Sequence, residues 1–193
     1  MKFIKHLYKI HIHRKWVRRY CFGLGLYWQG LTHDLSKYSP TEFFESVKFY
    51  QGTSSPIDAA KKAQGYSLAW FHHRGRNKHH HVYWVDNFDE GMTFVVNPYK
   101  YMAEMICDFI GAGRAYMGKN FTYRSELNWW NKRKEKYAMA PVCKDFVSII
   151  FESLAEIEDN YGMKYTDKLF RNGYGKRMVK EIYEACIKLE API

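Results

Sequence analysis

Apolar residues recur every three or four positions along most of the chain, which is the spacing of amphipathic helices. The first such segment covers residues 3–22, is basic, and has an apolar stripe composed of Ile4, Leu7, Tyr8, Ile12, Trp16 and Tyr20. His13 lies beside this stripe at the helical phase of Val17, so we expect it to face the interior. His11 lies on another side and is expected to be solvated.

Prolines mark the starts of the predicted helices. Four of the five stand in start signals: Ser39-Pro40, Ser55-Pro56, Asn97-Pro98 and Ala140-Pro141. Ser39-Pro40-Thr41-Glu42 also has the pattern of a capping box, in which the Glu42 carboxylate reaches back to the Ser39 amide. Only residues 92–96 suggest a short strand or an extended linker, so the pattern predicts an all-α protein.

Further helices are expected over residues 26–37, 97–116, 142–161 and 176–189. The second of these contains Asp108, next to three small residues at 111–113 that would admit another backbone or a metal ion. An unpaired buried carboxylate is expensive, so we expect Asp108 to be paired, metal-bound or at an edge. Glu104, one turn earlier, is either a partner of the same site or a solvent-facing residue.

No repeat or linker divides the 193 residues, so we expect a single-domain helical bundle. Its chemical core would span residues 10–120, and packing helices would span residues 121–190. The net charge of +10 favours anionic partners, either phosphorylated small molecules or nucleic acid. The four cysteines are far apart, which favours reduced thiols, and no apolar run is long enough to span a bilayer. We therefore expect a cytoplasmic protein without a membrane partner; the oligomeric state is not specified.

Histidines are concentrated in the first part of the chain, where all nine precede residue 82. The His33-Asp34 pair combines two ligand types that suit a hydrolytic divalent metal, and the nearby Lys37 suits a phosphate. A second dense region holds His72, His73, His79, His80 and His81, interleaved with Arg74, Arg76 and Lys78. We interpret this region as functional, although a basic surface loop would have a similar composition. A basic aromatic stretch at residues 129–134 is either a stacking platform or a helix edge.

In chain order, His13, His33-Asp34, the later paired histidines and Asp108 resemble the HD superfamily of all-helical metal-dependent phosphohydrolases. This resemblance implies a bundle of HD-domain type and metal ligation by His13, His33, Asp34 and Asp108, with His11 as the alternative first ligand. It also implies that later histidines help to bind an additional metal; the candidates are His72, His73, His79 and His80. The segments HDLSKYSP and HHRGRNKHH are more closely similar to a family of uncharacterised domains. No Gly-Tyr-Pro signature follows His72-His73, so cyclic-dinucleotide cleavage is not expected.

The sequence thus favours hydrolysis of a nucleotide or another phosphoester with one or two ions of Mn, Fe, Co, Ni or Zn. The candidate catalytic residues are Lys37, Glu42, Arg74 and Arg76. The cations would neutralise the phosphoryl group, and Glu42 would act as a general base if it is not needed for capping. One alternative is a nucleic-acid-binding module with a structural or vestigial metal. Another is a regulatory protein that kept the fold and lost the chemistry.

Overall fold

The computed structural model describes residues 2–89 and 91–190. This part of the chain contains ten α-helices, which confirms the all-α prediction. The helices are α1 (Lys2–Gly23), α2 (Tyr27–Thr32), α3 (Pro40–Lys48), α4 (Pro56–Gln64), α5 (Leu68–Arg76), α6 (Tyr99–Met117), α7 (Tyr123–Asn131), α8 (Pro141–Tyr161), α9 (Met163–Phe170) and α10 (Gly173–Glu190). Short 3₁₀ turns are η1 (Leu35–Tyr38), η2 (His81–Trp84), η3 (Gly118–Asn120) and η4 (Lys134–Lys136).

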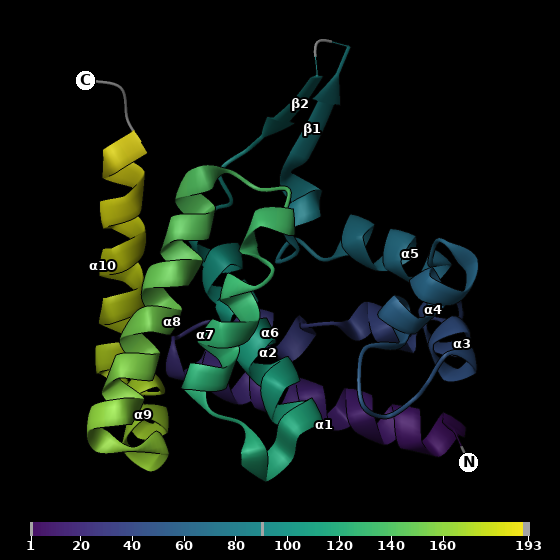
Figure 1. The fold of residues 1–193 in the computed structure, drawn as a ribbon, viewed down its shortest axis with the longest axis horizontal. Coiled ribbons are helices and arrows are strands. Elements are labelled where there is room, and N and C mark those ends of the chain that lie inside the picture. The colour runs from purple at the N-terminus through teal and green to yellow at the C-terminus, as the bar shows by residue number, and fades with distance from the viewer. Residues whose placement is uncertain (1, 90, 191–193) are drawn as a thin grey trace.

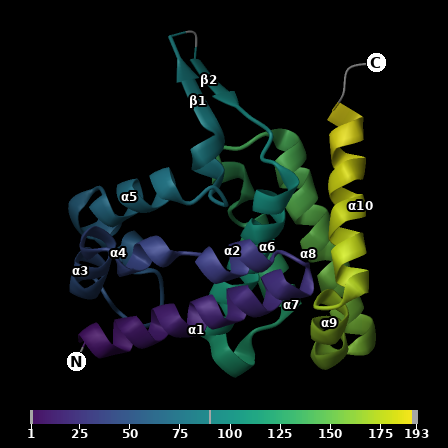
Figure 2. The same cartoon turned by 180° about the vertical axis from the view of Figure 1, so that it is seen from behind.

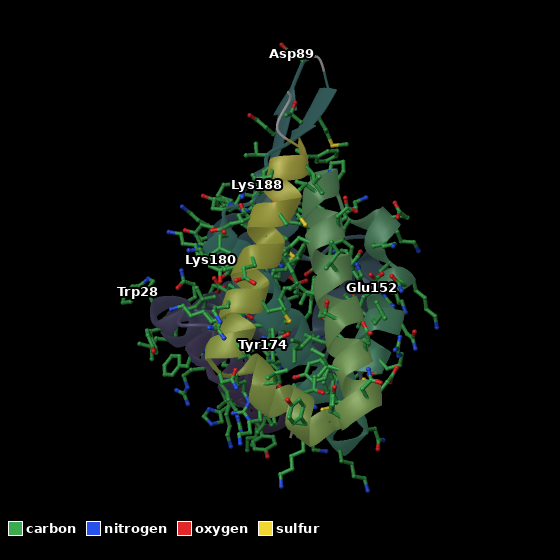
Figure 3. The ribbon with its side chains drawn as sticks, turned by 90° about the vertical axis from the view of Figure 1, so that its left-hand side faces the viewer. Trp28, Asp89, Glu152, Tyr174, Lys180 and Lys188 are labelled. Atoms are coloured by element: carbon green, nitrogen blue, oxygen red, sulfur yellow. The ribbon has the colours of Figure 1, made fainter. Side chains whose placement is uncertain are left out.

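The helices form a bundle in which two groups of helices flank a central pair (Figure 1). Helices α3, α4 and α5 gather on one side and α8, α9 and α10 on the other, while α1 and α6 pack against each other between them (Figures 1 and 2). Helices α8 and α10 lie side by side, with Glu152, Lys180 and Lys188 on their outer surface (Figure 3). The hairpin of β1 (Val85–Phe88) and β2 (Gly91–Phe94) projects away from the helices (Figure 1).

The apolar core lies where α1, α6, α7, α8 and α10 meet. Its largest fully buried side chains are Trp130, Tyr20, Tyr123, Phe146, Phe151 and Phe170. A Cβ on Gly111 would lie only 2.5 Å from Cγ2 of Val17, so the missing side chain lets α1 approach α6. The small residues after Asp108 therefore admit a neighbouring backbone, as the sequence suggested.

The apolar stripe predicted for α1 is wrong in the first half of the helix, although Tyr20 near its end is fully buried as predicted. Ile4 and Tyr8 are 71% and 64% exposed, whereas the buried face runs through His6, Ile10 and His13. His6 and Lys9 in the first half of α1 line a cavity, so hydrophobicity alone does not identify the inner face of this helix. His13 does face the interior, as its helical phase predicted.

Two other local predictions differ from the structure. The helix expected over residues 26–37 ends at Thr32 and continues as the turn η1. The extended segment at 92–96 overlaps β2, but its partner β1 was not predicted. Of the two alternatives for residues 129–134, the structure excludes stacking on Trp130, which is fully buried at the end of α7 and donates a hydrogen bond to Ser148 Oγ at 2.9 Å. Among the described residues, no helix is both long and apolar enough to cross a bilayer.

Candidate metal centre

The His33-Asp34 pair lies in a turn rather than in a helix. His33 ends α2 with ψ +125°, and Asp34 follows with φ +53°, a left-handed conformation. Consecutive helical side chains point about 100° apart, whereas this turn brings both side chains into the interior, where they are 2% and 1% exposed. Arg14 supports the turn by donating hydrogen bonds to the carbonyl oxygens of His33 (2.8 Å) and Leu31 (2.9 Å).

A first group of four ligand atoms comes from α1, this turn and α6. His13 Nε2 lies 3.3 Å from Asp34 Oδ2 and 3.1 Å from Asp108 Oδ1. His33 Nε2 lies 3.3 Å from each of these oxygens and 3.3 Å from His13 Nε2. Bonds of about 2.0–2.1 Å to a tetrahedral ion place neighbouring ligand atoms about 3.3 Å apart. The four side chains therefore have the spacing of a single metal site.

A second group uses the other oxygen of Asp34. Asp34 Oδ1 lies 3.3 Å from His73 Nε2 and 3.5 Å from His79 Nε2, and His80 completes the group. Asp34 Oδ1, His79 Nε2 and His80 Nε2 are buried and have no hydrogen-bond partner. Buried polar atoms without partners are destabilising, and a bound cation would satisfy all three. Asp34 thus stands between two candidate metal positions.

Two further carboxylates fix the orientation of these histidines. Glu104 Oε1 accepts hydrogen bonds from Nδ1 of His33 at 2.9 Å and of His79 at 3.1 Å, and so links one histidine of each group. Glu42 Oε2 accepts from His73 Nδ1 at 2.7 Å. A carboxylate only accepts, so each Nδ1 carries a proton, and a metal ion can bind at each Nε2 in place of a proton.

Glu42 does not close the predicted capping box. Its amide donates to Ser39 Oγ at 3.4 Å, which is one half of that motif. Its carboxylate turns instead towards α5, where Oε1 accepts from His72 Nδ1 at 2.6 Å and Oε2 binds His73. The reciprocal bond is absent because the Ser39 amide donates to the Ser36 carbonyl at 2.8 Å, while the two imidazoles engage the Glu42 carboxylate.

Groups that favour opposite charges face each other in the centre. Burial opposes ionisation of Asp34 and Asp108, but the facing histidines, together with Lys37 at Asp34, hold the pKa of both carboxyl groups well below the usual range. Burial likewise opposes protonation of His33 and His73, but the carboxylates around them raise the pKa of both. Lys37 Nζ lies 2.5 Å from Asp34 Oδ2. Such a set binds a metal by exchanging imidazole protons for the ion.

A cavity of about 430 Å³ opens beside the centre, with His13, His73, His80 and Asp108 in its wall. This is a size typical of small-molecule sites. Its walls carry three ammonium groups, from Lys9, Lys37 and Lys61, and the aromatic rings of Trp70, Tyr116 and Tyr137. The cavity can therefore hold an anionic small molecule against the candidate ligands.

The structure brings together seven of the eight predicted metal ligands. They are His13, His33, Asp34, His73, His79, His80 and Asp108. The eighth, His72, belongs to neither group and binds Glu42 instead, and His11 is exposed on the outer side of α1.

The predicted cations divide in the same way. Lys37 reaches the centre, whereas Arg74 packs over the Phe71 ring and Arg76 donates to the His72 carbonyl, and neither arginine lines the cavity. Lys9 and Lys61 line it instead and were not predicted. The position of Lys9 one turn before His13 could have indicated it, but no sequence signal distinguishes Lys61 from its neighbours.

Comparison with known proteins gives one finding. Neither a search of curated proteins nor one of solved structures gave a match to the chain. A family profile matches residues 2–155, a span that includes every residue of both candidate metal groups. This confirms the likeness to an uncharacterised family that the sequence motifs indicated. The chain belongs to DUF5662, a family of unknown function.

Proposed function

We propose that this protein is a metal-dependent phosphohydrolase of HD-superfamily type, acting on a nucleotide or another small phosphoester. The observation that carries the proposal is the position of Asp34. Its two carboxylate oxygens face two separate sets of imidazole and carboxylate ligands, in the wall of a cavity that carries ammonium groups. Paired metal positions beside a cation-lined cavity suit the attack of water on a phosphoester.

The ligand types support one or two ions without naming them. The first group offers two imidazole nitrogens and two carboxylate oxygens, and the second offers three imidazoles and one carboxylate oxygen. Such mixed nitrogen and oxygen sets suit Mn, Fe, Co, Ni or Zn. A divalent ion held there lowers the pKa of a bound water and polarises the phosphoryl oxygens.

The protein's own residues would position and neutralise the substrate. Lys37 and Lys9 lie in the cavity wall, where their ammonium groups can bind phosphoryl oxygens. Glu42 has both carboxylate oxygens engaged by histidines, so we assign it the positioning of His73 rather than the role of general base. Arg74 and Arg76 lie outside the cavity lining and receive no role in this proposal.

The metal content of purified, untagged protein tests the proposal directly. We expect wild type, after incubation with Mn, Fe or Zn, to bind up to two ions per chain by mass spectrometry, one for each group that shares Asp34. Asp34→Ala should lose both, whereas His13→Ala and Asp108→Ala should lose the ion of the first group. His11→Ala is the matched control for His13→Ala, because His11 is an exposed histidine on the same helix, and it should load normally.

Turnover provides the second readout. Wild type and His11→Ala should hydrolyse nucleotides or a chromogenic phosphoester, lose that activity in chelator and regain it with added metal. Wild type that binds no metal, or Asp34→Ala that loads fully, would overturn the metal assignment. A loaded protein that hydrolyses none of a broad panel of phosphoesters would overturn the reaction and leave a metal-binding protein of another kind.

A further inference from the structure

Lys61 is a cation of the cavity that takes no part in the metal centre. It lies on α4, which contributes no ligand to either metal group, and its Nζ is 4.7 Å from the centre of the Trp70 ring. Among the described residues, no carboxylate pairs with it at ion-pair distance. The other two lysines of the cavity are engaged, Lys37 with Asp34 and Lys9 with the Ala115 carbonyl at 2.7 Å. Within the part of the chain that the structure describes, Lys61 is therefore the cavity lysine that has neither an ion pair nor a hydrogen bond.

Asp58, one turn before Lys61 on α4, also lines the cavity, but among the described residues no ion pair joins the two side chains. Burial is the main cause that lowers the pKa of Lys61; the charge of Asp58 opposes this lowering, and the charge of Arg74 adds to it. The ammonium group is therefore partly desolvated without a carboxylate in contact, and a bound anion would offset that cost.

We propose that Lys61 binds a second anionic group of the substrate, so that the substrate carries a phosphate or a carboxylate besides the phosphoester that meets the metal centre. This inference rests on the proposed function, because it takes the first anionic group to be the scissile phosphate. An anion in contact with Lys61 would supply the ion-pair partner that this lysine lacks. The Trp70 ring limits the freedom of the lysine, which lowers the cost of ordering it on binding.

Two contacts at opposite ends of a ligand also fix its direction in the cavity. One end would be set by the metal centre and Lys37, and the other by Lys61. An ion pair at a partly exposed site contributes only a few-fold in affinity, so Lys61 would act mainly as a selector between substrates with one and with two anionic groups.

Non-hydrolysable probes separate this binding from catalysis. We would titrate metal-loaded protein with linear alkyl monophosphonates and with α,ω-alkane bisphosphonates of increasing chain length, and follow the heat of binding. Wild type should bind the best bisphosphonate about three- to fivefold more tightly than the monophosphonate of equal length. A matched series with a carboxylate at the far end shows whether the second group is a phosphate or a carboxylate.

Lys61→Met should abolish this preference and leave monophosphonate binding and metal content unchanged. Lys62→Met is the matched control, since Lys62 is the neighbouring lysine on α4 and does not line the cavity, and it should behave as wild type. Equal affinity of wild type for one and two anionic groups at every length, or a preference that survives in Lys61→Met, would overturn the proposal. Failure of the proposed function has a different signature, because protein without bound metal would not bind the monophosphonates either.

Discussion

Asp34 and Glu126 are both buried carboxylates, 1% and 5% exposed, and the protein treats them in opposite ways. Asp34 lies among histidines and Lys37, and their positive charge holds its pKa well below the usual range. Glu126 on α7 has the backbone of Gly113 and the Phe121 ring near its carboxylate, and burial, with a smaller effect of Asp108, raises its pKa to about 8. Burial opposes the charge in both cases, so the partners decide the sign of the shift.

The same contrast separates two regions of the molecule. Around the cavity, α1, α3, α5 and α6 bury imidazoles and carboxylates that either pair with one another or have the spacing of metal ligands. Around α7 and α8, the interior is filled by rings such as Trp130, Phe146 and Phe151. We infer that the first region is organised for chemistry and the second for stability, and three substitutions test that division.

The largest effect is expected from Glu126→Gln at alkaline pH. The folded pKa of Glu126 is raised above its unfolded value near 4.5, so the unfolded chain releases this proton first. The contribution of Glu126 to the free energy of unfolding therefore falls as pH rises from 4.5 to 8 and then stays constant. At about 1.4 kcal/mol per pH unit, the difference between variant and wild type should approach an upper limit of about 5 kcal/mol at pH 9.

Urea unfolding of both metal-free proteins at pH 5 and pH 9 measures this difference. Wild type and variant share every other titratable group, so the comparison isolates Glu126. The variant should match wild type closely at pH 5 and exceed it at pH 9. A stability difference that does not change with pH would show that Glu126 is ionised in the folded protein.

Phe151→Ala should have the next largest effect, and it is confined to the apolar region. The Phe151 ring is fully buried in the core formed with α7 and α10. Its removal leaves a cavity and should lower the free energy of unfolding by about 3–5 kcal/mol. Below the unfolding transition, the variant should bind as many metal ions per chain as wild type. Loss of metal from the fully folded variant would contradict the separation of the two regions.

The helices of the apolar region could largely be predicted because they follow simple rules. The expected helix over 142–161 agrees with α8, and that over 176–189 lies within α10. In both, periodic apolar residues face a core of similar side chains. The predictions failed where polar groups are buried, as on α1, where His6 and His13 face inwards while Ile4 is exposed. Hydrophobic periodicity carries no information about an interior that is itself polar.

The candidate site could be predicted only in part. The order of His13, His33-Asp34 and Asp108 along the chain indicated one group, and the structure brings these residues together. The contribution of Asp34 to the second group, through its other oxygen, depends on a left-handed turn. The neighbouring residues do not predict this turn. Lys61 enters the cavity only through the packing of α4. Such long-range contacts have no counterpart in local sequence patterns.

Glu104→Gln should have the smallest effect on stability of the three and a specific effect on metal affinity. In wild type, Glu104 Oε1 accepts from Nδ1 of both His33 and His79, which raises the basicity of the two Nε2 atoms that face the candidate ions. A neutral amide accepts these bonds more weakly, so affinity should fall by about 10- to 100-fold.

Competition with a chelating dye measures this affinity, and Glu126→Gln provides the control. It makes the same substitution at a buried glutamate for which the structure gives no histidine contact, and its metal affinity should equal that of wild type. Equal affinities of Glu104→Gln and wild type would mean that the carboxylate does not support the metal ligands. A loss of equal size in both variants would trace the effect to general loosening of the fold. A loss confined to Glu104→Gln would show that the polar region uses its buried carboxylates to prepare histidines for metal, while the apolar region merely tolerates Glu126.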